Sequence, residues 1–123
     1  MTTAPDDDDN HVFLRGRLAD EPTTKELPSG DELTVFRLTV SRPPGDRVRV
    51  DSIECATTRA RPRRALERAA VGAVVEVSGS LRRRFWRGPA GPASRYTVDV
   101  ATARVIRSDR AGGASRARTP ASA

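Results

Sequence analysis

The chain has 123 residues, of which 37% are hydrophobic and 31% are charged, and its formal net charge is +6. This length and hydrophobic content allow one small domain with one core and exclude a second domain. No apolar run is long enough to span a bilayer, and the first nine residues have no apolar segment that would form a secretory signal. The single cysteine, Cys55, excludes an internal disulfide and a cysteine-rich zinc site, and it favours a reducing cytoplasm.

Charge and composition divide the chain into three parts. Residues 1–9 hold four aspartates and no basic residue, so we expect an acidic disordered arm. Residues 10–106 hold 18 basic and 11 acidic residues and alternate strand patterns with turn signals, which predicts the folded domain. Residues 107–123 have almost nothing to bury, so we expect a disordered basic tail. The net positive charge of the domain favours a polyanionic partner, although a genome rich in arginine codons explains much of the arginine content.

Two strands are predicted before the middle of the chain. The first has an apolar side, formed by Val12, Leu14, Gly16 and Leu18, and an open side, formed by Phe13, Arg15 and Arg17. A glycine inside a strand predicts a bulge or a close approach of two backbones. After the turn residues at 27–30, the second strand has a buried row, formed by Phe36, Leu38 and Val40.

A third strand and a helix follow. Val48 and Val50 begin the strand, and the apolar parity then changes near Asp51 and Ser52, which predicts a bulge. The helix is expected at 61–70, since a proline suits its first turn, apolar residues recur four apart and a glycine follows as a stop.

The fourth predicted strand, at about 74–86, ends in the sequence LRRRFW. If the strand stays regular, Arg82, Arg84 and Trp86 lie on one open face. Cations beside a flat ring form a minimal site for single-stranded nucleic acid, whereas a tryptophan that covers the core is the alternative. Phe85 has the parity of the buried row, so we expect it to pack in the core. A loop at 88–92 leads to a fifth strand at about 95–106.

The element order is β-β-β-α-β-β. This order predicts an all-β protein, a five-stranded OB-fold barrel with one short helix and disordered termini. Such barrels commonly bind oligonucleotides on one face, but the order alone does not determine the function.

Two segments resemble the bacterial single-stranded DNA-binding proteins. Asn10–Leu18 matches the family pattern N-x-V-x-L-x-G-x-L, and Glu21-Pro22 stands where D-P is usual. The segment from Gly72 to Trp86 matches G-x-x-V-x-V-x-G-x-L-x-x-R-x-W, and Arg95-Tyr96 matches a later R-Y pair. The resemblance implies a non-enzymatic OB-fold that coats single-stranded DNA in replication, recombination and repair, usually as a homotetramer. A cytoplasmic, nucleoid-associated location goes with that role.

The resemblance and the strand patterns together indicate which residues bind the strand. Trp86 matches a base-stacking tryptophan of the family, and Tyr96 matches a residue that is more structural than DNA-contacting. Phe13 is expected to stack on a base or to lie at a subunit contact. The candidate residues for binding single-stranded DNA are Trp86, Arg84, Arg82, Arg37, Arg17, Arg15, Arg49, Arg95 and Phe13.

The chain departs from the family in two respects. Other stacking aromatics of the family fall near Pro44, Ser52 and Thr58, none of which is aromatic here. We therefore expect affinity to depend more on phosphates than on rings. The acidic, hydrophobic tip that recruits replication and repair enzymes is missing from the sequence, which indicates a specialised paralogue and makes such protein partners doubtful.

Two other functions stay open at this point. An RNA-binding OB-fold protein would show the same rings and cations, since only contacts to the 2′-hydroxyl separate RNA from DNA. An OB-fold module that mediates protein interactions would explain the missing aromatics. No catalytic, metal-binding or cofactor motif is recognisable: His11 has no Cys or Ser partner, and the segment 88–91 lacks the lysine of a phosphate loop.

Overall fold

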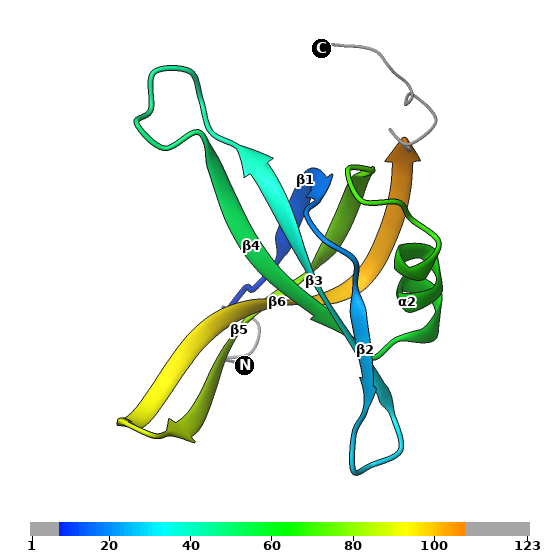
Figure 1. Cartoon of the computed structure of the whole chain (residues 1–123), viewed down its shortest axis with the longest axis vertical. Coiled ribbons are helices and arrows are strands. Elements are labelled where there is room, and N and C mark those ends of the chain that lie inside the picture. The colour runs from blue at the N-terminus through cyan, green and yellow to red at the C-terminus, as the bar shows by residue number, and fades with distance from the viewer. Residues whose placement is uncertain (1–7, 108–123) are drawn as a thin grey trace.

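The structure is a computed structural model that describes residues 8–107. Its elements are β1 (Val12–Leu18), β2 (Thr23–Glu26), β3 (Glu32–Ser41), β4 (Val50–Thr57), α2 (Ala60–Glu67), β5 (Val74–Gly88) and β6 (Gly91–Arg107) (Figure 1). The expected acidic arm and basic tail fall mainly on residues 1–7 and 108–123, outside the described residues.

The strands form one sheet that closes into a barrel. They are hydrogen-bonded in the order β1-β5-β6-β4-β3-β2, and β1 also pairs with β3. That additional pairing, Arg17 with Thr39 and Leu18 with Leu38, closes a ring of five strands and leaves β2 at the outer edge of β3. Because the helix lies between the third and fourth barrel strands, the predicted OB-fold is confirmed.

Two sequence predictions for the strands need correction. The prediction of a bulge near Asp51 and Ser52 is wrong, because β3 and β4 pair without a break from Thr34–Thr57 to Ser41–Val50. The apolar parity changes there because Val50 lies outside the core, where it is exposed. In addition, β2 was not expected; its four residues are all exposed, so it has no hydrophobic alternation to detect.

The predicted helix and the last two strands have different limits in the structure. The helix ends at Glu67, three residues before the predicted end, and the turn that follows leads to Gly72, whose φ of 93° favours glycine. β5 and β6 are longer than expected and are joined by two residues, 89 and 90, in place of the predicted loop at 88–92.

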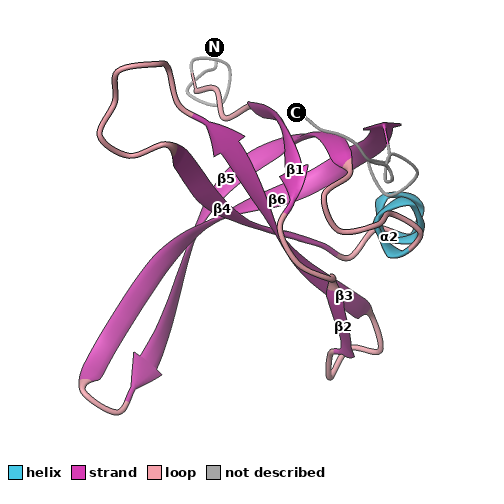
Figure 2. Cartoon of the chain, turned by 45° about the horizontal axis from the view of Figure 1, so that its top comes forward, coloured by secondary structure: helices cyan, strands magenta, loops and turns pink. Residues whose placement is uncertain are grey.

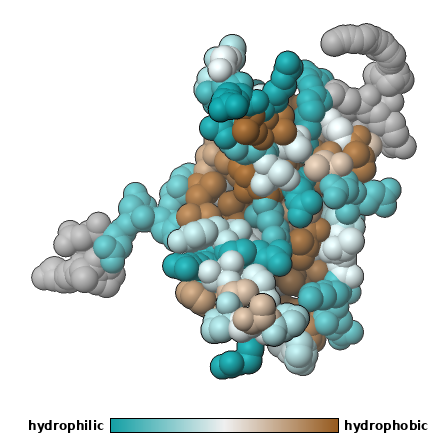
Figure 3. All heavy atoms as spheres, turned by 60° about the vertical axis from the view of Figure 1, so that its left-hand side comes forward, coloured by the Kyte–Doolittle hydropathy of each residue, from teal (hydrophilic) through white to brown (hydrophobic). Residues whose placement is uncertain are grey.

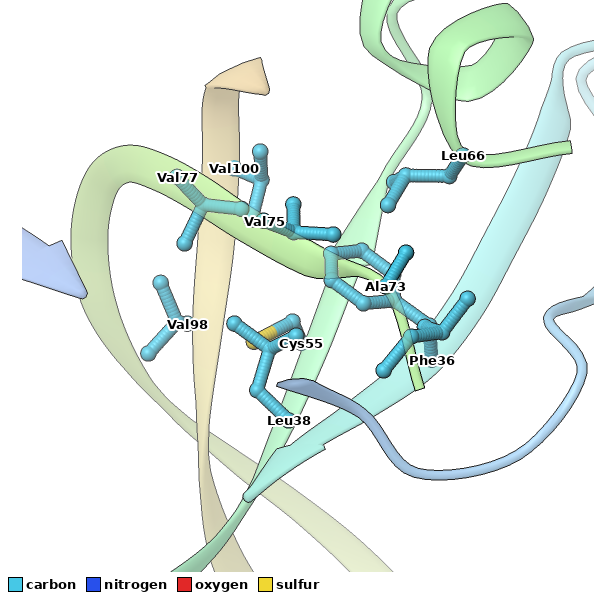
Figure 4. Packing of buried hydrophobic residues seen from close by; sticks show 10 residues of the cluster. Phe36, Leu38, Cys55, Leu66, Ala73, Val75, Val77, Val98 and Val100 are labelled. Atoms are coloured by element: carbon cyan, nitrogen blue, oxygen red, sulfur yellow. The ribbon is translucent and has the colours of Figure 1, made fainter. Parts of the chain in front are cut away.

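Mainly aliphatic side chains from every strand of the barrel fill the core. Figure 4 shows them packed together, with Leu66 of α2 pointing into the same cluster. The buried cluster consists of Leu18, Phe36, Leu38, Cys55, Leu66, Ala73, Val75, Val77, Val98 and Val100. Burial raises the pKa of the Cys55 thiol to about 12, and the nearby Glu54 carboxylate adds to this effect.

Two glycines allow the strands to cross closely. A Cβ atom on Gly16 would lie 2.5 Å from the carbonyl oxygen of Thr39, so the predicted close approach of backbones is confirmed. A Cβ atom on Gly79 would lie only 1.9 Å from the carbonyl oxygen of Asp99. Gly79 lies next to a shift in the register between β5 and β6, where Ser78 pairs with Thr102 and Gly79 with Val100.

Three hairpins project from the barrel, and the one formed by β5 and β6 is the most relevant to function (Figures 1 and 2). Pairing with β1 ends at Gly79, and pairing with β4 ends at Val98. Beyond these points, among the described residues, residues 81–88 of β5 pair only with residues 91–98 of β6. We call this two-stranded ribbon the arm.

Candidate nucleic-acid interface

The arm has two faces that differ in the side chains they carry. Successive side chains of a strand point to opposite faces, and directly paired residues of neighbouring strands point to the same face. Arg84 pairs with Arg95, and Trp86 follows two residues later, so these three share one face. We call this the outer face, because it continues the exterior of the barrel. The inner face continues the row of Val75 and Val77 beyond the core.

On the outer face, Trp86 and Arg95 form a stacked pair beside a carboxylate. The guanidinium carbon of Arg95 lies 4.9 Å from the centroid of the Trp86 ring. Nη1 of Arg95 also donates a hydrogen bond of 2.7 Å to Oε1 of Glu54 on β4. The ring is 42% exposed, so part of it is accessible to a ligand. Arg95 is thereby held in place by a ring on the arm and by a carboxylate on the barrel.

The outer face is continuous with the exterior of β3 and β4. Arg37 of β3 pairs directly with Glu54 of β4, which in turn binds Arg95. A shallow hollow of about 270 Å³ lies here, lined by Asp20, Glu21, Thr23, Val35, Phe36, Arg37, Glu54 and Arg95. The row Arg37, Glu54, Arg95 and Trp86 therefore connects the barrel wall to the arm.

Arg82 lies at the base of the arm, near a second hollow. Its Nε atom is 3.7 Å from Oδ2 of Asp99, and both side chains are about half exposed. The hollow has a volume of about 290 Å³, and two further basic residues, His11 and Arg59, line it. Arg82 thus belongs to the same strand row as Arg84 and Trp86 but is paired with its own carboxylate.

The predicted basic residues of β1 lie on a different surface. Nε of Arg15 donates a hydrogen bond of 2.9 Å to Glu76 of β5, and Nη2 of Arg104 donates one of 3.0 Å to the same carboxylate. These two hydrogen bonds lower the pKa of Glu76 from its usual value of 4.5. Phe13, also on β1, is 57% exposed. Arg17 donates a hydrogen bond of 3.0 Å to the carbonyl oxygen of Gly72.

Arg49 belongs to neither surface, because it lies in the loop of the β3–β4 hairpin. This loop surrounds a hollow of about 550 Å³ and is held by hydrogen bonds from Arg42 to Asp46 and Asp51. In Figure 1, the β3–β4 hairpin and the arm extend from different parts of the barrel. The structure therefore brings together Arg37, Arg95, Arg84 and Trp86, with Arg82 at the base of the same row. It places Arg15, Arg17, Phe13 and Arg49 elsewhere.

The family model for the single-strand binding protein family (SSB) matches residues 9–108, which is most of the chain. The chain belongs to this family. The match begins just before β1 and ends just after β6, so it includes the whole barrel and the arm. Proteins of the SSB family are DNA-binding proteins without enzymatic activity.

The SSB fold is also found by comparison with solved structures. A structure described as a Plasmodium falciparum SSB complex with ssDNA matches with a TM-score of 0.68 and 23% sequence identity. The match covers 87% of this chain and 98% of that chain, so the two share the fold over almost their full lengths. A search of the curated proteins found none that matches this chain.

The prediction that Phe85 packs in the core is wrong. Phe85 has the parity of the core residues, but its side chain is 71% exposed, and Leu81 on the same row is 43% exposed. The reason is that β5 leaves the barrel after Gly79, so its inner row continues without a core to face. Figure 3 shows one face of the molecule, where hydrophobic residues lie at the surface among hydrophilic ones.

Sequence reasoning missed two residues that position the candidate site. Nδ2 of Asn10 donates a hydrogen bond of 2.8 Å to the carbonyl oxygen of Leu81, and the Leu81 amide donates one of 2.8 Å to Oδ1 of Asn10. Asn10 thereby anchors the base of the arm. Glu54, the second residue, holds Arg95 over Trp86. The pattern N-x-V was a signal for Asn10, whereas no sequence signal pointed to Glu54.

Within residues 8–107, no group of three or more His, Cys, Asp or Glu side chains is arranged to hold a metal ion. Among the same residues, no helix is both long and apolar enough to cross a membrane.

Proposed function

We propose that the chain binds single-stranded DNA without strong sequence preference and protects it during replication, recombination and repair. Membership of the SSB family supports this function, and a structure with the same fold is described as a complex with ssDNA. The observation that carries the proposal is the row Arg37, Arg95 and Trp86, which combines phosphate-binding cations with a stacking ring on one continuous surface.

In this proposal, Trp86 stacks on a base, and the arginines of the same surface bind phosphates. Arg95 takes part in the same contact, because a guanidinium plane can itself stack on a base. Arg84, Arg82 and Arg37 extend the positive surface from Trp86 toward the barrel. The remaining candidates, on β1 and in the β3–β4 hairpin, contact the strand only if it extends beyond this surface.

We also propose a homotetramer that acts where single-stranded DNA forms, in the cytoplasm beside the nucleoid, without catalysis of its own. Homo-oligomers are typical of the SSB family. Phe13 supports a contact between copies, because it is a large apolar side chain that is 57% exposed on the outer side of β1. Light scattering at micromolar concentration measures the assembly, and a monomeric mass would refute the tetramer.

Titration with oligo-dT tests the function directly. Trp86 is the only tryptophan in the chain, so its fluorescence reports on this surface alone. We expect quenching that saturates, and we expect the apparent affinity to fall as salt rises. Absence of binding at low salt would reject the function. Tighter binding to a matched RNA oligomer than to DNA would assign the surface to RNA instead.

A further inference from the structure

The inner face of the arm carries a second cluster of rings around a cation. The guanidinium carbon of Arg83 lies 5.0 Å from the centroid of the Phe85 ring and 5.5 Å from that of Tyr96. Arg83 pairs directly with Tyr96 across the two strands, and Phe85 follows two residues along β5, so all three point to the same side. This side is opposite to the one that carries Trp86 and Arg95.

These rings have no structural role in the core. Phe85 is 71% exposed and Tyr96 is 58% exposed, and the ribbon that carries them pairs with no other strand of the described part of the chain. The barrel would therefore keep its core if either ring were removed. Large exposed aromatic side chains on a projecting ribbon mark a binding surface rather than a packing contact.

The charge of the arm indicates which kind of ligand this surface takes. Residues 81–98 contain five arginines and no acidic residue. On the outer face, Arg95 and Arg82 are already paired with carboxylates of the barrel strands. Arg83 has no carboxylate partner within residues 8–107; its Nη2 and Nε atoms bond only to the Ser94 hydroxyl, at 3.2 and 3.4 Å. Its charge is therefore available to an anion without breaking an ion pair.

We propose that the inner face of the arm is a second binding site for single-stranded nucleic acid, where Phe85 and Tyr96 stack on bases and Arg83 binds a phosphate. The proposal rests on the proposed function and extends it to the opposite face of the same ribbon. A purely positive surface with two rings around a cation matches the alternation of phosphates and bases, whereas it would repel a basic protein surface. One strand can then contact both faces by passing around an edge of the arm, where the backbone is unpaired.

Two lengths of oligo-dT distinguish binding at the outer face of the arm from binding at both faces. An OB-fold occupies about 4–16 nucleotides, so a strand of about five nucleotides covers one face and a strand of about sixteen can cover both. The test variant is Phe85→Leu/Tyr96→Leu, which removes both rings but keeps apolar side chains on the ribbon. We expect it to bind the longer strand at least about fivefold more weakly for each ring that is lost. Quenching of Trp86 by the shorter strand should stay at the wild-type level.

The matched control is Val71→Ala, which removes an exposed apolar side chain before β5 and should bind both strands as the wild type does. Photocrosslinking with a bromouracil-substituted oligomer, followed by peptide mapping, gives a direct readout. Crosslinks are expected at Phe85 or Tyr96 in addition to Trp86.

The inner-face site is rejected if the double variant binds the longer strand normally, or if crosslinks form at Trp86 alone. It is also rejected if the variant changes the oligomeric mass in light scattering, because the rings would then belong to a contact between copies. Failure of the proposed function has a different signature, since the wild-type protein would then bind neither strand.

Discussion

The two halves of β5 illustrate how one strand can serve a core and an interface. Val74, Val75 and Val77 are buried in the barrel, whereas residues 81–87 are all exposed on the arm. β6 shows the same division, with Val98 and Val100 buried and Tyr96 exposed. The alternation of side chains continues through the transition near Gly79, and only the surroundings of the strand change. Periodicity alone therefore identifies the faces of a strand but does not show where a core ends.

This difference implies that stability and binding can be changed separately. Substitutions in the barrel half should lower the free energy of unfolding, and substitutions in the arm should lower affinity for nucleic acid with little effect on unfolding. The following predictions test this separation, beginning with the largest expected effect.

Gly79→Ala should destabilise the barrel strongly. The added Cβ atom would lie 1.9 Å from the carbonyl oxygen and 2.9 Å from the carbonyl carbon of Asp99, so the backbone of β6 must move. We expect the free energy of unfolding to fall by about 2–3 kcal/mol, the upper part of the usual range for overpacking. Urea denaturation measures the change.

Gly88→Ala is the matched control for this prediction, because Gly88 lies at the arm end of the same strand. Its added Cβ atom would be 3.5 Å from the nearest atom, the carbonyl oxygen of Gly91, which is an ordinary contact. Equal loss of stability in the two variants would show that the close contact with Asp99 does not cause the loss.

On the arm, the ring and the cations should affect binding in different ways. Trp86→Ala should weaken binding of oligo-dT by about 1–3 kcal/mol with little change in the slope of log affinity against log salt.

Replacement of Arg82 and Arg84 together by Ala should weaken binding and also flatten this slope, by about 0.7 for each phosphate contact that is lost. Anisotropy of a labelled oligomer at several salt concentrations gives both quantities.

A double arginine variant with the wild-type slope would mean that neither side chain meets a phosphate. The strand would then have to follow another surface, such as the row of basic residues on β1.

Glu54→Gln should increase affinity by a smaller amount. The carboxylate of Glu54 binds Arg95 and lies on the surface that phosphates would approach, so it competes with the ligand for this guanidinium. A gain of about 1 kcal/mol or less is expected, because Arg95 is about half exposed and such pairs are weak. Glu32→Gln, whose carboxylate pairs with Arg63 beside the helix, is the control. Weaker binding by Glu54→Gln would show that the role of Glu54 in orienting Arg95 matters more than its competition with phosphates.

The smallest effect should come from Glu76. Its pKa is lowered in the folded protein by hydrogen bonds from Arg15 and Arg104, so folding favours the ionised carboxylate. This contribution to stability is present above the ordinary pKa of 4.5 and is lost as the pH falls through the lowered value. Glu76→Gln should flatten the pH dependence of unfolding in this acidic range. Urea denaturation at several pH values measures this dependence.

Much of the fold could be predicted from the sequence because the barrel strands alternate regularly. Val12, Leu14 and Leu18 on β1, and Phe36 and Leu38 on β3, show the period of two that a half-buried strand requires. β2 could not be predicted, since a strand with all its side chains exposed has no such period. The bulge was predicted wrongly because the parity change in β4 reflects the end of the core and not an extra residue.

The candidate site was predictable only in part. Trp86 and Arg84 follow from alternation on one strand, and Arg95 from the motif that accompanies them. Their connection through Glu54 depends on the pairing of β4 with β3 and β6, which links residues about 40 positions apart in the chain. The exposure of Phe85 depends on where β5 leaves the barrel, and the local sequence does not encode this point.

The burial of Cys55 gives the molecule a built-in reporter of barrel opening. Its thiol is fully buried and its pKa is about 12, so almost no reactive thiolate is present while the barrel is closed. Alkylation of this single cysteine therefore requires an opening event and measures how often the barrel opens. Because the only tryptophan lies on the arm, the chain carries one natural probe in each region. Alkylation of Cys55 then reports opening of the barrel, and Trp86 fluorescence reports changes at the arm, without added probes.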